Sequence, residues 1–241
     1  KQYIMICQQN ISDKFKSLNF DKRKKKISFI ILHYTETKTF EKAISLLTDT
    51  KRKVSCHYLI DVNGKIFNLV DLENRAWHAG ESKWKNFKDL NSHSVGIEIV
   101  YPGEKSDSLY EKKQIKALIN LMIFLKKKFN ISNNRILGHS DIAPLRKTDP
   151  GKFFPWEQLG KFSLGLWVKT RGENTELTKN QYAKFLKNLK SIGYRYLSNK
   201  INNKKVINSF HRHHLPMLTG SPPNQSSLLK SIDILNLKRI D

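Results

Sequence analysis

The stretch from Gly138 to Gly151, GHSDIAPLRKTDPG, concentrates residues that can bind a metal ion or move a proton. It holds one histidine, two aspartates and two adjacent basic residues around two prolines. His139 and Asp149 stand ten residues apart, across a loop that proline stiffens. Asp, Ser, Pro and Gly also build ordinary surface turns, so this stretch alone does not distinguish a metal site from a turn.

His33 is a second source of ligands, because it follows a nearly continuous apolar run, residues 27–32, that is typical of a buried strand. A strand end lets a rigid sheet present a side chain into a cleft. Together with His139 and Asp149 it gives two imidazoles and one carboxylate, which leave the fourth position of a tetrahedral zinc ion open for water. Asp141, two residues from His139, is better suited to structuring the turn.

Hydrophobic periodicity predicts the elements that position these residues. A helix is expected after Thr39 as N-cap, because apolar residues recur at helical spacing in residues 40–47. Residues 54–71, VSCHYLIDVNGKIFNLVD, predict a hairpin in which Asn63-Gly64 forms a type I′ turn. The segment 108–130 predicts an amphipathic helix whose last turn carries lysines, where cations suit the helix dipole.

Glu98 is a carboxylate inside an apolar strand predicted for residues 94–100. Successive side chains of a strand point to opposite faces. One face therefore carries Val95, Ile97 and Ile99, and the other carries Gly96, Glu98 and Val100. A carboxyl group partly removed from water by such neighbours can take up and release a proton near neutral pH.

Composition restricts the class of protein. The 241 residues include 44 Lys and Arg against 21 Asp and Glu, a formal charge of +23, which makes nucleic-acid binding an alternative function. The lysines lie in separate segments without an RNP-like, zinc-finger or basic-zipper pattern, so we expect no nucleic acid and a surface suited to an anionic polymer or membrane face. No run of about 18 apolar residues occurs, which excludes a membrane-spanning helix by length.

The two cysteines, Cys7 and Cys56, leave one bridge or two free thiols open. Cys56 and His57 do not predict a thiol enzyme, because adjacent strand residues face opposite sides. His57 faces either the cleft or the core, and we expect the core. The chain starts at Lys1 rather than Met, from which we expect a fragment or a processed product.

Five motifs, ILHYT, VSCHYLID, AWHAG, VGIEIV and GHSDIAPLRKTDPG, come in the order and spacing of the zinc N-acetylmuramoyl-L-alanine amidases of the type-2 amidase family. The chain resembles the AmpD and AmiD branch, which shares its fold with peptidoglycan recognition proteins. The resemblance covers roughly residues 27 to 160. It implies an α/β fold with a mixed central β-sheet flanked by helices, and we expect a small C-terminal all-α domain to follow.

The resemblance also implies roles for single residues. His33, His139 and Asp149 would be the ligands of Zn²⁺. Glu98 would be the catalytic glutamate, and Lys147 the lysine that stabilises the transition state. The substrate would be peptidoglycan or a muropeptide, cut at the amide between N-acetylmuramic acid, or its 1,6-anhydro form, and L-alanine.

Four further residues are candidate substrate contacts. Trp77 and His78 lie in AWHAGESKW, which resembles the loop lining the family's substrate groove, although Trp77 and Trp84 are equally well explained as hydrophobic braces. Asn91 either contacts the substrate or only structures its loop. Arg146 is the fourth candidate, beside Lys147.

We predict an N-terminal extension (residues 1–26), a zinc amidase catalytic domain (27–162), a linker (163–177) and a helical peptidoglycan-binding-like domain (178–241). Its helical stretches, 178–194, 204–216 and 226–235, are separated by turn-forming Asn202-Asn203 and by GSPPN. LKNLKSIGY and VINSFHRHHLP resemble the three-helix peptidoglycan-binding domain, with Phe210-His211 where that pattern usually has Phe-Gln. If this domain anchors the protein to the wall, we expect its deletion to leave hydrolysis of small muropeptides intact, because every proposed catalytic residue lies before Gly160, and to reduce cleavage of the polymer.

Two open questions follow from these patterns. His211, His213 and His214 form either a metal cluster or, as we expect, a polar helix face. The main alternative function is a non-catalytic peptidoglycan recognition module, but such modules often lack a zinc ligand, whereas all three ligands and Glu98 are present here. We expect the cell envelope as the location, in the periplasm, secreted or at the outer membrane, with the cytoplasm as the alternative.

Overall fold

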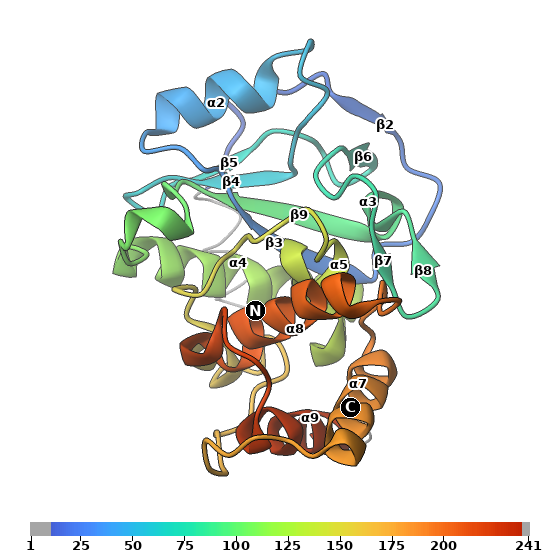
Figure 1. Cartoon of the computed structure of the whole chain (residues 1–241). Helices are drawn as coiled ribbons and strands as arrows, with labels where there is room; N and C mark the ends of the chain where they lie inside the picture. The colour runs from blue at the N-terminus through green and yellow to red at the C-terminus, as the bar shows by residue number, and fades with distance from the viewer. Residues whose placement is uncertain (1–10, 238–241) are drawn as a thin grey trace.

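The computed structural model describes residues 11–237, and its centre is a six-stranded mixed β-sheet. In spatial order the strands are β1 (Ile11–Ser12), β5 (Ile66–Asn68), β4 (Tyr58–Ile60), β9 (Ser94–Ile99), β3 (Phe29–Tyr34) and β10 (Ile136–Gly138). Strands β4, β9, β3 and β10 are mutually parallel, and β5 pairs with β4 in the antiparallel sense. Helices flank this sheet, which confirms the predicted fold class (Figure 1).

Two small two-stranded sheets border the main one. They pair β2 (Phe20–Lys22) with β6 (Asn74–Ala76), and β7 (Lys83–Trp84) with β8 (Phe87–Lys88). Because β1 pairs with β5 in the main sheet and β2 pairs with β6, residues from 11 onward are part of the same fold as the predicted catalytic domain.

Helix α4 (Lys112–Phe129) covers one face of the sheet. Glu111 and Gln114 form a capping box that starts the helix, and Asn130 ends it in the left-handed conformation. The predicted apolar stripe is confirmed, because Leu118, Met122 and Leu125 are fully buried against strand residues. The helix begins at Lys112, four residues later than the start of the predicted segment, since the capping box fixes its first turn there.

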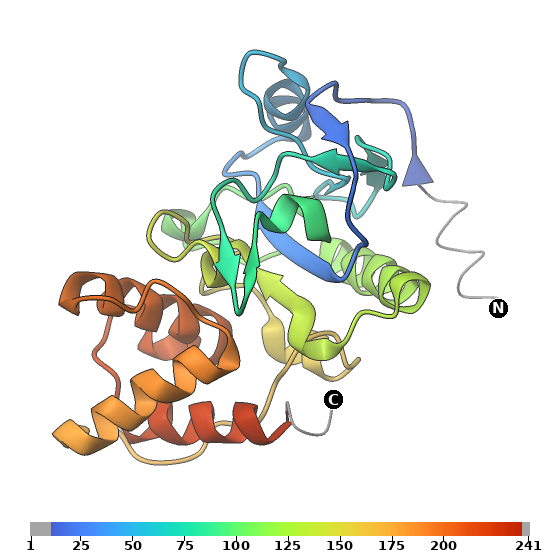
Figure 2. The ribbon, with the colours of Figure 1, turned by 90° about the vertical axis from the view of Figure 1, so that its right-hand side faces the viewer.

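The opposite face has two separate covers. Helix α2 (Phe40–Thr48), capped by Thr39 as predicted, packs with β4 and β5 at one end. At the other end the sheet packs against the C-terminal helices α7 (Lys179–Ile192), α8 (Lys200–His214) and α9 (Gln225–Leu237) (Figure 2). Phe29 and Ile31 of β3 share one hydrophobic core with Phe185 and Phe210 of these helices. Polar residues can therefore occupy this face of the sheet only between α2 and the C-terminal helices.

The remaining helical segments are short. They are α3 (Leu90–His93), η1 (Glu104–Ser106), η2 (Asn133–Arg135), α5 (His139–Ile142), α6 (Trp156–Gly160) and η3 (Pro216–Leu218). Between α6 and α7 the chain is irregular apart from a single bridge between Glu176 and Asn224. Within residues 11–237 no helix combines the length and apolar character needed to cross a membrane.

Three local predictions are corrected by the structure. The β4–β5 hairpin exists, but its turn is not type I′, because Gly64 has a positive φ of 82° and Asn63 does not. The Asp61 side chain accepts hydrogen bonds from the backbone N–H groups of Asn63 and Lys65, which closes a longer loop. Asn202-Asn203 is not a turn but lies inside α8, because Asn199 caps that helix and starts it earlier.

The third correction concerns His211, His213 and His214. They do not form an exposed polar face of α8, because all three are buried. His211 contacts the Leu218 carbonyl and Ser227, while His213 contacts Asp141 and stacks on Trp156. Among the described residues they are not part of a metal-binding group either. The helical unit uses them at its inner surfaces, which amphipathicity alone does not reveal.

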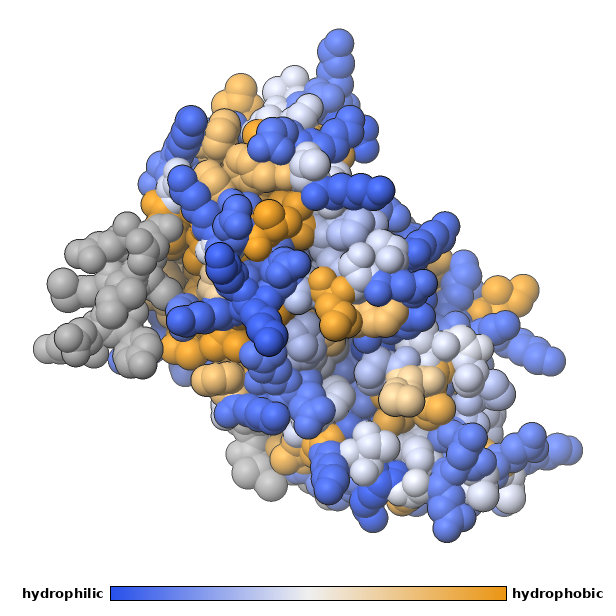
Figure 3. Space-filling model, turned by 90° about the vertical axis from the view of Figure 1, so that its left-hand side faces the viewer, coloured by the Kyte–Doolittle hydropathy of each residue, from blue (hydrophilic) through white to orange (hydrophobic). Residues whose placement is uncertain are grey.

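Hydrophilic side chains are spread over the surface rather than gathered in one stripe, and small hydrophobic patches lie between them (Figure 3). This distribution agrees with lysines placed in separate segments of the sequence. The net charge of +23 suits general attraction to anionic polymers.

Candidate active site

His33 is the penultimate residue of β3. Its side chain projects from the part of the sheet face that lies between α2 and the C-terminal helices. Its neighbours Ile30 and Leu32 point to the α4 side, and Ile31 to the side of the helical unit. Strand alternation therefore places the His33 side chain on the same face as Ile31. The side chain is almost completely buried.

His139 and Asp149 approach His33 from the loop that follows β10. Strand β10 pairs in parallel with β3, so its end brings His139, the first residue of α5, next to His33. The backbone N–H of Ser140 donates to the Asp149 carbonyl at 2.9 Å, which ties the two ends of the loop together. The loop geometry thus holds both residues beside the strand.

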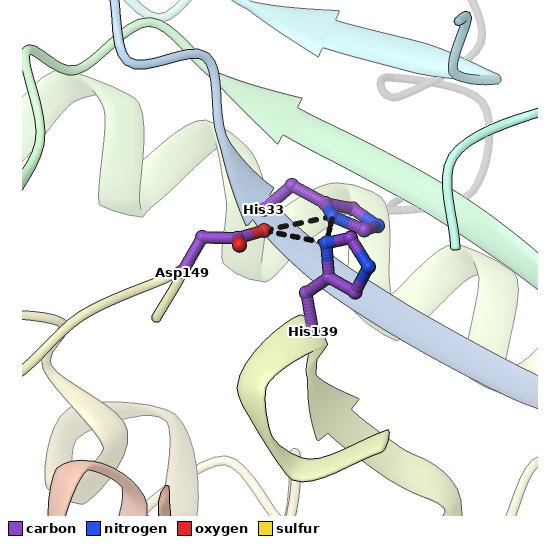
Figure 4. A group of neighbouring side chains, drawn as sticks. All are labelled: His33, His139 and Asp149. Atoms are coloured by element: carbon purple, nitrogen blue, oxygen red, sulfur yellow. Dashed lines mark hydrogen bonds and ion pairs between the residues drawn. The ribbon is translucent and has the colours of Figure 1, made fainter. Parts of the chain in front are cut away.

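The three side chains converge on one point (Figure 4). His33 Nδ1 lies 2.9 Å from Asp149 Oδ2 and 3.0 Å from His139 Nδ1, and His139 Nδ1 lies 3.0 Å from Asp149 Oδ2. Among the described residues this is the group of His, Cys, Asp and Glu that fits a metal ion. The predicted His33, His139 and Asp149 set is therefore brought together in space.

A chain of hydrogen bonds fixes the protonation of His33. Ser94 Oγ donates to the Leu90 carbonyl at 2.6 Å, so it accepts from His78 Nε2 at 3.1 Å. His78 Nδ1 is then left to accept from His33 Nε2 at 3.0 Å. Burial lowers the pKa of both histidines, that of His33 to about 4, with the charge of a neighbouring histidine adding to the effect. The neutral His33 therefore turns its unprotonated Nδ1 toward the convergence point.

His139 is oriented in the same way. Its Nε2 lies 3.0 Å from the Ala79 carbonyl, which can only accept, so the proton sits on Nε2 and Nδ1 carries the lone pair. The Asp149 carboxylate brings the third donor atom, Oδ2, to the same point. Three electron-pair donors then meet within about 3 Å without a proton between them. Such a donor set fits a cation, with the outer hydrogen bonds typical of metal-binding histidines.

Glu98 lies beside this donor set on the next strand. The β3–β9 register pairs His33 with Glu98, and strand alternation turns both side chains to the same face. The carboxyl is buried, and its Oε2 has no hydrogen-bond partner within residues 11–237. Burial raises the pKa of Glu98 to about 8, the negative charge of Asp149 adds to this, and Lys147 opposes it. A nearby dication would act in the same direction as Lys147.

Comparison with known proteins agrees with this geometry. Residues 23–152 match the family model described as N-acetylmuramoyl-L-alanine amidase. The chain belongs to the N-acetylmuramoyl-L-alanine amidase family. It is 35% identical to the N-acetylmuramoyl-L-alanine amidase AmiD of Escherichia coli in an alignment of 214 residues that covers 80% of this chain and 76% of AmiD.

A second relative matches a smaller part of this amidase, whereas the solved structure of AmiD matches most of it. The 1,6-anhydro-N-acetylmuramyl-L-alanine amidase AmpD of Haemophilus influenzae is 38% identical over 106 residues, 44% of this chain and 56% of AmpD. The structure of E. coli AmiD, solved with the substrate anhydro-N-acetylmuramic acid-L-Ala-D-gamma-Glu-L-Lys, superposes with a TM-score of 0.80 and 30% identity, covering 89% of this chain and 91% of that one. The likeness to AmiD therefore extends through the C-terminal helices.

The amidase cleft is a cavity of about 400 Å³ whose lining includes His139 and Asp149 of the converging group. Its lining contains Glu98, Lys147, His78 and Arg146, all singled out from the sequence. It also contains residues that sequence reasoning missed: Tyr34, Thr35, Glu36, Arg52 and Thr148. Tyr34 and Thr148 hydrogen-bond through their hydroxyls at 2.7 Å, but nothing in their local sequence distinguishes them from other polar residues.

The cleft residues differ in how they are held. Arg146 donates to the carbonyl oxygens of Ala79 and Glu81, so its guanidinium braces the 79–81 loop against the site. Lys147 makes no side-chain hydrogen bond or ion pair within the described part of the chain and lines the cleft. The two adjacent basic residues are therefore held differently: the guanidinium of Arg146 is tied to the 79–81 loop, whereas the ammonium of Lys147 is not.

Trp77 and Asn91 lie outside the lining of the amidase cleft. Trp77 donates from Nε1 to Asp21 at 2.7 Å. Asn91 Oδ1 accepts hydrogen bonds from the backbone N–H groups of His78 and Ala79 at 3.0 and 2.6 Å. Asn91 thereby shapes the loop that holds His78 against His33. These placements support structural roles in the 77–91 segment.

His57 and Cys56 are interior residues, which confirms the expected core position of His57. The Gly96 N–H donates to His57 Nδ1 at 2.9 Å, and an Arg23 amino group lies 2.8 Å from Nε2. Burial and the Arg23 charge lower the pKa of His57 to about 3, so it is neutral. Burial raises the pKa of the free Cys56 thiol, which disfavours a thiolate nucleophile. Cys7 lies outside the described residues.

Proposed function

We propose that this protein is a zinc-dependent hydrolase of the amide bond between N-acetylmuramic acid, or its 1,6-anhydro form, and L-alanine, in peptidoglycan and in muropeptides. The convergence of His33 Nδ1, His139 Nδ1 and Asp149 Oδ2 beside the buried Glu98 carries this proposal. Membership of the amidase family and the substrate complex of E. coli AmiD support it.

Two imidazole nitrogens and one carboxylate oxygen are the ligand types of catalytic zinc sites that keep a position open. Zinc held there would lower the pKa of a coordinated water to about 7 and polarise the scissile carbonyl. The protein would contribute a rigid donor set, because Ser94, His78 and the Ala79 carbonyl fix the orientation of both imidazoles.

Glu98 is the proposed general base and acid. Burial raises the pKa of this carboxyl to about 8, and the positive charge of Lys147 and of a bound dication would lower it. The carboxylate accepts the proton of the attacking water and delivers it to the departing amino group of L-alanine. The attack places negative charge on the former carbonyl oxygen, and we assign its stabilisation to the ammonium of Lys147, one of the cationic side chains that line the cleft. The products are a free lactyl carboxylate and a peptide with a free L-alanine amino group.

Lys147→Met should lower kcat by about 10²-fold, the lower end of the effect of removing one stabilising donor from an oxyanion site. The KM should change little, because the charge that Lys147 stabilises develops only in the transition state. Steady-state kinetics on a muropeptide measures both values. Lys116→Met, on the exposed side of α4, is the matched control and should retain normal kinetics. An unchanged kcat in Lys147→Met would contradict the role.

Mass spectrometry of the products tests the function as a whole. The purified protein is incubated with sacculi and with an anhydromuropeptide, each with and without a chelator. We expect stem peptides beginning with L-alanine and the matching muramic acid product, lost on chelation. Binding of muropeptide without any cleavage by the metal-loaded protein would favour the non-catalytic recognition module instead.

We propose that the protein acts in the cell envelope. The match to E. coli AmiD extends over 80% of the chain, whereas the match to AmpD covers 44%, and a net charge of +23 favours contact with anionic wall polymers. Cell fractionation with an antibody to the protein tests this location. Recovery in the cytoplasmic fraction alone would contradict it.

A further inference from the structure

The loop that carries two of the three proposed metal ligands is held from outside by the C-terminal helical unit, residues 178–237. This loop, residues 138–152, contacts the unit directly at two places and is joined to it at a third through Glu104. The Lys205 ammonium of α8 donates to the Leu145 carbonyl at 3.0 Å in the middle of the loop. The other two contacts lie near its ends, one beside His139 and one beside Asp149.

The contact beside His139 is a buried network centred on Asp141, which is fully removed from solvent. Asp141 Oδ2 accepts from the Gly138 N–H at 2.8 Å and lies 2.7 Å from His213 Nδ1. Asp141 Oδ1 accepts from the Tyr194 hydroxyl at 2.7 Å. Ser209 lies further away, at 3.4 Å. One carboxylate thus joins the start of α5 to two elements of the helical unit.

A buried carboxylate is retained only when hydrogen bonds replace its lost hydration. The backbone N–H that donates to Asp141 belongs to Gly138, the residue directly before His139. The remaining close partners, His213 and Tyr194, come from residues 72 and 53 positions later in the chain. His139 is the first residue of α5. The direction of α5, which sets where the His139 side chain leaves the backbone, therefore depends on groups supplied by the helical unit.

The contact beside Asp149 runs through Glu104. Arg212 Nε of α8 donates to Glu104 Oε1 at 2.9 Å, and the same oxygen accepts from the Lys152 N–H at 2.8 Å. Both side chains of the ion pair are mostly buried. Lys152 follows Asp149 by three residues, so this pair fixes the loop where it leaves the site.

We propose that the helical unit positions the metal-ligand loop, with His213 and Tyr194 acting through Asp141, and Arg212 acting through Glu104, as positioning residues. This inference rests on the proposed function for its link to catalysis, but its direct effect is on metal affinity. It replaces the expectation that the unit is dispensable for small substrates. Ligands must be held within a fraction of an ångström, and residues that orient them typically contribute about 10–100-fold to metal affinity.

The test measures metal affinity in the full-length chain. Metal-free protein is titrated with Zn²⁺ against a chromophoric chelator, and with Co²⁺ while the visible absorption of tetrahedral coordination is recorded. Tyr194→Phe removes one hydrogen bond to Asp141 and keeps the ring that packs on Trp84. We expect about tenfold weaker Zn²⁺ binding and an altered Co²⁺ spectrum in this variant.

Two substitutions of His213 form a matched pair. His213→Asn keeps an N–H donor near the position of Nδ1, whereas His213→Gln moves it to the position of Nε2, and both lose the stacking on Trp156. We expect His213→Gln to lose about tenfold in Zn²⁺ affinity and His213→Asn to recover most of it. Equal affinities in both variants and in Tyr194→Phe, at the wild-type value, would overturn the proposal.

Ser231→Ala is the control for general destabilisation. Ser231 accepts from Asn188 at 2.9 Å between α7 and α9, away from the metal-ligand loop. We expect a lower melting temperature with unchanged Zn²⁺ affinity. If Ser231→Ala weakened Zn²⁺ binding as much as His213→Gln, the effect would be unspecific and the proposal would fail. If the wild type bound Zn²⁺ but cleaved no muropeptide, the proposed function would fail while the affinity differences still tested the positioning role.

Discussion

Replacing Glu98 with Gln should lower turnover of a muropeptide by about 10²–10⁴-fold, the usual range for loss of a general acid–base group. The amide has nearly the same shape as the carboxyl, so strand β9 and the donor set should remain intact. It cannot accept the proton of the attacking water at neutral pH. Steady-state kinetics together with elemental analysis separates a chemical defect from a loss of metal.

Glu41→Gln provides the control for this experiment. It removes one negative charge from an exposed position in the first turn of α2, away from the cleft, and should leave kcat and KM unchanged. Zinc content should be equal in the wild type and in both variants. If Glu98→Gln turned over at a nearly normal rate with normal zinc, another group would have to carry the proton, and the assignment of Glu98 would be wrong.

Replacing His139 with Ala should abolish both metal binding and activity. The wild-type protein should hold about one Zn²⁺ per chain, because three protein atoms converge on a single point. The variant retains only His33 and Asp149, and two ligands do not complete the donor set of a catalytic zinc site. Elemental analysis after dialysis should fall from about one zinc per chain to near zero.

His93→Ala is the matched histidine control, because His93 is only half-buried and lies outside the converging group. Its zinc content and activity should equal those of the wild type. Circular dichroism should show a folded His139→Ala variant, since the main sheet and its cores do not depend on the imidazole. Wild-type protein that holds no transition metal and keeps its activity with a chelator would contradict the zinc site.

Tertiary structure also explains why two turn predictions differ from the observed backbone. The Asn63-Gly64 dipeptide indicated a hairpin correctly, but Asp61 accepts two backbone hydrogen bonds and imposes a longer loop. Asn202-Asn203 has turn-forming residues, yet the cap supplied by Asn199 carries the helix through it. Local propensities compete in such cases, and the hydrogen bonds that decide between them depend on the actual backbone path.

The sequence by itself predicted the strands that correspond to β3, β4, β5 and β9, the main helices and, with the family resemblance, the set of His33, His139, Asp149 and Glu98. Short-range periodicity and the order of the motifs depend only on local residue types, and strand alternation is enough to turn Glu98 to one face. The sequence also separated Lys147 from its neighbour as the cation to examine. These inferences need no knowledge of contacts between distant segments.

Only the tertiary structure decided which groups support that set. The hydrogen bonds from Leu90 through Ser94 and His78 to His33, and those from His213 and Tyr194 to Asp141, join residues far apart in the chain. Such partners leave no periodic signal, because a histidine on a helix looks the same in the sequence whether it faces water or a buried carboxylate. The roles of His213 and Tyr194 arise from the packing of the C-terminal helices against β3 and β10, which the folded chain alone establishes.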